Sequence, residues 1–166
     1  MSRIIFFEGD GIIGKAIGAA TGSRMSHVAW QTPDGTLWEA VDEGFKATPD
    51  DHAAYGDWLA PMRRYHPAGT RIHAFDLALF DKQEEKALEF LESIRDDEYG
   101  FRTLFAFMMH PGKDPEPGKV ICSEAVLGAS IYAGYPLLDR IQPHQCSPRD
   151  LYISPRLGRW LGSYTL

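Results

Sequence analysis

The segment 25–41 reads MSHVAWQTPDGTLWEAV and predicts a β-hairpin. Two strand-like runs, Met25–Gln31 and Thr36–Val41, flank the turn sequence Pro33-Asp34-Gly35. Runs of this kind that are separated by a short loop containing glycine are typical of antiparallel strands joined by a tight turn. The sheet of this protein is therefore expected to be antiparallel, at least in part.

The register of this hairpin determines which side chains share a face of the sheet. A three-residue loop pairs Thr32 with Thr36 and places Ala29 opposite Glu39. His27 then lies diagonally across from Glu39 on the same face, at about 7–8 Å, where two long side chains can meet. A two-residue loop would instead turn Glu39 to the opposite face.

The rest of the chain predicts both strands and helices. Apolar runs predict strands at 4–7 and 70–79. Apolar spacing and terminating residues predict helices at 12–20 and from Cys122 to about Ala133. Two further helices are expected to begin at Asp81, which forms a capping box with Glu84, and at Ser147-Pro148. Residues 42–69 are expected to be irregular, and residues 101–109 to form a buried helix or a pocket wall. This mixture predicts an α+β fold, and the absence of repeats and linkers predicts a single domain over residues 1–166.

Composition narrows the classes of function. The chain has 166 residues, with 17 Lys and Arg against 23 Asp and Glu, and a net charge of −6. An acidic chain lacks the clustered basic surface that binds nucleic acid or anionic membranes. No run approaches the roughly 18 apolar residues of a membrane span, and no signal peptide is evident, so we expect a cytoplasmic protein. Two cysteines, Cys122 and Cys146, are too few for a disulfide framework or a cysteine-rich zinc site.

A glycine-rich loop suggests one hypothesis for the function, nucleotide binding. Residues 9–14 spell G-x-G-x-x-G between a predicted strand and a predicted helix, and Lys15 extends the match toward a P-loop. Ala16 stands where a P-loop has a hydroxyl, and the following strand turns back through the hairpin instead of running parallel. A tight turn and close helix packing account for these glycines equally well. A nucleotide-binding module that uses Gly9–Lys15 remains the alternative function.

Cys122 offers a second reading, because it opens a predicted helix after the extended segment Val120-Ile121. A thiol at this position faces unpaired backbone N–H groups and the positive end of the helix dipole, which favour the thiolate. The thiolate is the nucleophilic form of cysteine. A reactive cysteine also needs a base and a group that orients the base.

Histidine supplies the candidate base. The six histidines are His27, His52, His66, His73, His110 and His144. Their spacing gives no convincing metal-binding motif, so neither a metal nor another cofactor is expected. His27 is distinctive because it interrupts a strand and has Glu39 as its predicted diagonal neighbour. Carboxylate, histidine and thiol are the orienter, base and nucleophile of a cysteine hydrolase.

These motifs, in this order, resemble one family. Ser26-His27-Val28, Trp38-Glu39-Ala40 and Cys122-Ser123-Glu124 resemble the circularly permuted branch of the NlpC-type papain-like hydrolases. That branch includes the YiiX-like proteins and, distantly, lecithin:retinol acyltransferase. Thr21-Gly22-Ser23 and the stretch from Ser147 to Leu151 are also similar to the family pattern. The resemblance covers most of the chain.

The resemblance implies a papain-like α+β fold in which the cysteine helix packs on a small, mostly antiparallel sheet. It implies Cys122 as nucleophile, His27 as general base and Glu39 as third catalytic residue, with Asp42 or Glu43 in place of Glu39 if the register shifts. Tyr99, in Tyr99-Gly100-Phe101, is similar to a family tyrosine near the active site and is a candidate for substrate binding.

The implied activity is that of an amidase or peptidase, and an acyltransferase is possible. Its substrate would be a small-molecule, peptide or lipid-linked acyl compound, with residues 104–109 as a possible lining of an acyl pocket. A papain-like binding protein without catalysis is a further alternative.

Overall fold

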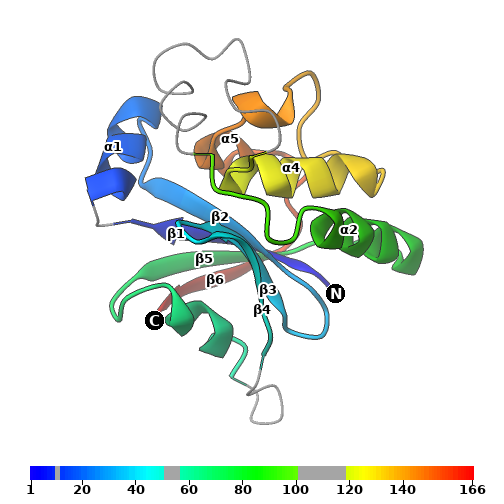
Figure 1. The fold of residues 1–166 in the computed structure, drawn as a ribbon, viewed down its shortest axis with the longest axis horizontal. Coiled ribbons are helices and arrows are strands. Elements are labelled where there is room, and N and C mark those ends of the chain that lie inside the picture. Colours follow the sequence, from blue (N-terminus) through cyan, green and yellow to red (C-terminus); the bar gives the residue numbers. More distant parts are fainter. Residues whose placement is uncertain (10–11, 51–56, 101–118) are drawn as a thin grey trace.

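A six-stranded antiparallel sheet lies at the centre of the part of the chain that the structure, a computed structural model, describes: residues 1–9, 12–50, 57–100 and 119–166 (Figure 1). The strand order is β4-β3-β2-β1-β5-β6, and each pair of neighbours is antiparallel. The strands are β1 (Arg3–Glu8), β2 (Met25–Gln31), β3 (Leu37–Val41), β4 (Gly44–Thr48), β5 (Arg71–Asp76) and β6 (Trp160–Thr165).

Helices cover both faces of the sheet. In the described residues the α-helices are α1 (Ile12–Thr21), α2 (Asp81–Ser93), α4 (Cys122–Tyr132) and α5 (Pro148–Tyr152), and the 3-10 helices are η2 (Ala60–Arg64) and η3 (Pro143–Gln145). Helices α2, α4 and α5 lie over one face, and η2 lies on the other (Figure 1). None of the helices in the described ranges is long and apolar enough to cross a membrane.

Strand β1 is buried on both faces, which explains its continuous apolar run. Ile4 and Phe6 belong to a core shared with α2, α4 and α5. Ile5 and Phe7 belong to a second core on the opposite face, together with Met62 of η2. Because side chains alternate along a strand, a central strand between two cores must be apolar at every position.

The predicted hairpin and its register are confirmed. The backbone N–H of Thr32 donates to the carbonyl of Thr36 at 3.0 Å, and Gly35 has a φ of 90°, in the left-handed region. Trp30 pairs with Trp38. The loop therefore has three residues, and the register is the one that brings His27 and Glu39 to the same face.

Two expectations about secondary structure need correction, and one strand was not predicted. Residues 42–69 contain strand β4 and helix η2 rather than irregular chain alone, because β4 adds to the edge of β3 and η2 covers the second core. The strand without a prediction is β6, at residues 160–165. Helix α2 begins after Phe80 rather than with a capping box of Asp81 and Glu84: the backbone N–H of Phe80 donates to Gln83 Oε1 at 3.1 Å, and no side chain of the N-cap residue accepts a hydrogen bond. Glu84 instead accepts a hydrogen bond from the backbone N–H of Ser2 at 2.8 Å.

The topology opposes a dinucleotide-binding fold at the glycine-rich loop. Strand β1 is antiparallel to both of its neighbours, β2 and β5, whereas the dinucleotide-binding fingerprint joins parallel strands through a crossover helix. Asp10 and Gly11 lie outside the described residues.

Replacing Gly158 by alanine is expected to destabilise the folded protein by about 1–3 kcal/mol, the usual cost of overpacking. A Cβ at this position would lie 1.9 Å from the carbonyl oxygen of Asp76, so the end of β5 would have to move. Urea unfolding measures the effect. Arg159→Ala is the control, because it removes the 2.9 Å ion pair with Asp76 without a clash. The Arg159 side chain is exposed and Asp76 keeps its contact with Arg3, so the loss of this pair should cost about 1 kcal/mol or less. Equal stability of Gly158→Ala and the unmodified protein would contradict the expectation.

Candidate functional site

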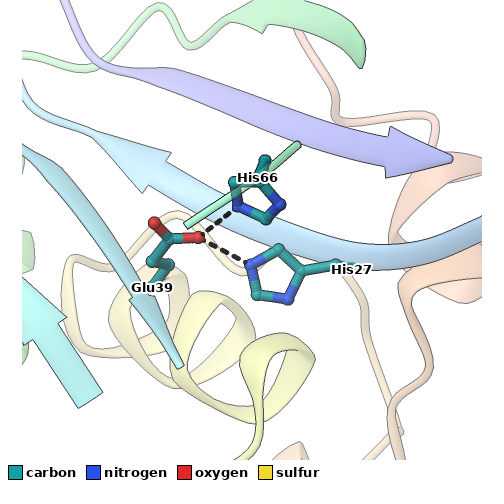
Figure 2. A group of neighbouring side chains, drawn as sticks. All are labelled: His27, Glu39 and His66. Atoms are coloured by element: carbon teal, nitrogen blue, oxygen red, sulfur yellow. Dashed lines mark hydrogen bonds and ion pairs between the residues drawn. The ribbon is translucent and has the colours of Figure 1, made fainter. Parts of the chain in front are cut away.

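Glu39 lies between two histidines (Figure 2). Its Oε2 atom is 2.9 Å from Nε2 of His27 and 2.8 Å from Nε2 of His66. The carboxylate is fully buried, while each histidine keeps about one-seventh of its side chain exposed, 16% for His27 and 14% for His66. A buried carboxylate must be paired with hydrogen-bond donors to offset its lost hydration, and the two imidazoles supply them.

Strand geometry positions His27 and Glu39. They extend from β2 and β3, and the hairpin register makes them diagonal neighbours. A β-bulge precedes His27, because Phe7 pairs with His27 while Glu8 pairs with Met25, which leaves Ser26 as the extra residue. A bulge bends its strand and redirects the adjacent side chain, and such bulges occur often beside active sites.

His66 reaches the same carboxylate from outside the hairpin. It follows η2, and its backbone N–H donates to the carbonyl of Met62 at 3.1 Å. Its ring stacks on Phe7 with a centroid distance of 4.0 Å and an interplanar angle of 19°. Stacking on a side chain of the second core fixes the ring plane, so Nε2 of His66 points at Glu39.

The charges of this cluster shift the pKa values of Glu39 and His27. Burial alone would raise the pKa of Glu39, but the hydrogen bonds and positive charges of His27 and His66 outweigh it and lower the pKa to about 2. Burial alone would lower the pKa of His27, but negative charge and hydrogen bonding at Cys122 and Glu39 raise it to about 10. The geometry therefore favours an ionised carboxylate beside an imidazolium.

Cys122 is the first residue of α4, and no side chain caps this helix end. The residue is buried, with 5% of its surface exposed, and its thiol interacts electrostatically with His27. Burial alone would raise the pKa of the thiol, but the charge of His27 and hydrogen bonds from His27 and the backbones of Val28 and Ser123 lower it. The structure thus brings Cys122, His27 and Glu39 together: Glu39 hydrogen bonds to His27, and His27 interacts electrostatically with Cys122.

Cys146 has a different environment. It is completely buried, and burial together with the negative charges of Asp150 and Cys122 raises the pKa of its thiol. Its backbone carbonyl accepts a 2.5 Å hydrogen bond from Ser123 Oγ, which ties its loop to the first turn of α4. The loop of Cys146 is therefore fixed to the first turn of the Cys122 helix, and its thiol is held in the protonated form.

Two hollows flank the histidines. One, of about 420 Å³, is bordered by Phe7, Glu8, Gly9, Ser26 and residues 66–70 together with His27. The other, of about 300 Å³, is bordered by His27, His66, Tyr65, Asp42 and Tyr99, among others. Tyr99 thus lies beside His27, where the sequence predicts a substrate-binding residue, and its substrate role stays a prediction.

The two outer segments of the family resemblance contact each other. Arg149 Nη1 donates to the backbone carbonyl of Thr21 at 2.9 Å, which joins the start of α5 to the end of α1. Ser147 caps α5, since its Oγ accepts from the N–H of Asp150 at 3.1 Å. These contacts connect α1 with α5 and do not involve the carboxylate of Glu39.

The sequence predicts Cys122, His27 and Glu39 of this site but not His66. Glu39, rather than Asp42 or Glu43, hydrogen bonds to His27. His66 was not foreseen, because it lies in a stretch without periodicity and only the fold brings it to Glu39. Although no metal site was expected, the nearest ligand atoms of His27, Glu39 and His66 all lie within 4.8 Å of one another. The proposed pocket lining at 104–109, as well as His52 and His110, lies outside the described residues.

Comparison with known proteins identifies a shared fold. No family model matches the sequence, and no curated protein matches it. Among solved structures, the chain is similar to the metalloprotein YiiX (DUF1105) from Escherichia coli O157:H7, with a TM-score of 0.68 and 18% sequence identity. The match covers 98% of this chain and 96% of that one. At this identity the likeness shows that the chain has a YiiX-like α+β fold.

Proposed function

We propose that this protein is a thiol-dependent hydrolase that acts on an amide or ester through an acyl-enzyme intermediate. The observation that carries the proposal is that Glu39 holds Nε2 of His27 at 2.9 Å while His27 interacts electrostatically with Cys122 at the start of α4. A carboxylate that orients the base, a histidine base and a cysteine nucleophile are the parts of a cysteine hydrolase. The resemblance to circularly permuted NlpC-type papain-like enzymes and the YiiX-like fold both support it.

Each residue of the series has one role in the reaction. The Cys122 proton moves to His27, and the thiolate attacks the substrate carbonyl to form a carbon–sulfur bond. The backbone N–H of Cys122 stabilises the oxyanion. His27 then gives its proton to the departing amine or alcohol as that bond breaks, which leaves the acyl group on Cys122. Water, deprotonated by His27, releases the acid; an alcohol or amine in its place would give acyl transfer.

Glu39 acts on the base rather than on the substrate. Its hydrogen bond to Nε2 directs the other imidazole nitrogen of His27 toward Cys122 and stabilises the imidazolium. We propose a small-molecule, peptide or lipid-linked acyl compound as substrate, with Tyr99 as a contact residue. The hollows beside His27 are compatible with a small group at the reacting centre.

The proposal is tested by the pH dependence of Cys122 alkylation by iodoacetamide, followed by peptide mass spectrometry. A free thiol titrates with a pKa of about 8.5. Because His27 lowers the pKa of Cys122, the alkylation rate should stay high below pH 8 and fall only in more acidic buffer. The same peptide in urea-unfolded protein is the control and should show the ordinary midpoint. A folded-state midpoint at or above that of the unfolded chain would contradict the proposal.

A further inference from the structure

We propose that His27, Glu39 and His66 form a binding site for one divalent transition-metal ion, held by Nε2 of each histidine and by the carboxylate. The three residues come from two adjacent strands and from the segment after η2, and they converge on one point (Figure 2). The metal site does not need Cys122, while its consequence for catalysis rests on the proposed function.

The distances fit such an ion after a small adjustment. With metal–ligand bonds of about 2.1 Å, neighbouring ligand atoms of a tetrahedral site are about 3.4 Å apart. Glu39 Oε2 is 2.9 Å from His27 Nε2 and 2.8 Å from His66 Nε2, and none of the three ligand atoms is more than 4.8 Å from another. Each of the two distances from Glu39 to a histidine would have to widen by roughly half an ångström to reach this spacing.

Glu39 offers a second, unused ligand atom. Its Oε1 is buried and has no hydrogen-bond partner in the structure. An unsatisfied buried polar atom is costly, and more so when the group is charged. A cation bound by both carboxylate oxygens would satisfy Oε1, whereas the two histidines reach only Oε2.

The donor types select the class of ion. Imidazole nitrogens suit Zn²⁺, Co²⁺ and Ni²⁺, whereas Mg²⁺ and Ca²⁺ prefer sites made of oxygen ligands. Two histidines and one glutamate are also a ligand set of catalytic zinc sites, which keep a further position open. His27 and His66 both border the two hollows, so that position can face a small ligand.

Metal binding and the thiol mechanism use the same atom of His27. Nε2 cannot hold a hydrogen bond to Glu39 and a metal ion at once, so the proton on that nitrogen leaves or moves to Nδ1 when the ion binds. A metal-bound His27 that carries its proton on Nδ1 has no lone pair left to accept a proton from Cys122. The ion would therefore inhibit hydrolysis by occupying the base.

The test measures Zn²⁺ binding in the Cys122→Ser protein by competition with a chromophoric chelator. We expect one ion per chain. His66→Gln removes a ligand while keeping a hydrogen-bond donor for Glu39. It should weaken Zn²⁺ affinity by more than about 100-fold, because losing only a residue that hydrogen bonds to a metal ligand already lowers affinity by 10–100-fold. His144→Gln is the matched control, since His144 lies in η3, outside the cluster, and should bind Zn²⁺ like its parent. Equal affinity of His66→Gln and its parent would overturn the inference.

Co²⁺ added to the unmodified protein gives an independent answer if a variant fails to fold. The inferred site predicts d–d absorption without a thiolate-to-cobalt charge-transfer band, because Cys122 is not a ligand. A thiolate band, or no Co²⁺ binding, would overturn the inference. Metal binding in a protein whose Cys122 reacts like an ordinary thiol would support the metal site and contradict the hydrolase. A reactive Cys122 in a protein that binds no metal ion would support the hydrolase and contradict the metal site.

Discussion

Replacing His27 by alanine is expected to lower the rate at which iodoacetamide alkylates Cys122 at pH 7 by at least about 30-fold. The charge and hydrogen bond of His27 lower the pKa of the thiol, and their loss leaves burial to raise it. A thiol with an ordinary pKa of about 8.5 is about 3% ionised at pH 7, which sets the size of the effect. The measurement is the time course of labelling on the Cys122 peptide.

Cys146 and His66 provide the controls for this experiment. Cys146 is fully buried and the pKa of its thiol is raised, so it should label slowly in both proteins. His66→Gln changes the other histidine on Glu39 and leaves the pair of His27 and Cys122 in place, so fast labelling should persist. If His27→Ala labels Cys122 as fast as the unmodified protein does, His27 is not the group that activates the thiol.

Replacing Glu39 by alanine is expected to destabilise the protein by about 3–5 kcal/mol, the usual cost of removing one partner from a buried charged pair. Both His27 and His66 lose their acceptor, and an isolated cavity remains between β2, β3 and the end of η2. Chemical denaturation at neutral pH measures the loss. Lys46→Ala is the control, because it breaks an exposed pair with Asp96 from the neighbouring strand β4 and should cost less than about 1 kcal/mol.

The same carboxylate predicts the acid dependence of stability. The pKa of Glu39 is about 2 in the folded protein against an ordinary value of 4.5. Between these values the unfolded chain binds more protons, so the contribution of Glu39 is complete above pH 4.5 and is lost as the pH falls toward 2. Glu39→Gln should lack this part of the acid dependence. An unchanged acid profile in Glu39→Gln would show that the carboxylate is not stabilised by the two histidines.

Prediction from the sequence worked best where the structure is local. The hairpin was predictable because Pro33-Asp34-Gly35 fixes the loop length, and loop length fixes the register. The same argument placed His27 and Glu39 on one face. Helix α4 was predictable at both ends, since Gly134 follows it and takes a φ of 73°, in the left-handed region.

Prediction failed where a segment is defined by what it packs against. Strands β4 and β6 are edge strands without strong alternation, and each forms because a neighbouring strand offers free hydrogen-bonding groups. Glu84 has the spacing of a capping residue, but its carboxylate accepts a hydrogen bond from the backbone N–H of Ser2 instead. The circularly permuted papain-like assignment and the thiol chemistry stay predictions, since the shared YiiX-like fold is the coarser finding.

The sequence by itself determined the α+β class, the hairpin and the placement of Cys122 at a helix start, because each depends on residues a few positions apart; it favoured the register that pairs His27 with Glu39, and the structure selected that register. Only the tertiary structure decided that His66 shares Glu39 and that Cys122 meets His27, 95 positions away in the chain. Long-range packing of η2 and α4 against opposite faces of the sheet makes these contacts, and no local pattern encodes them. That packing turns a candidate pair into a cluster that can bind a proton or, as we infer, a metal ion.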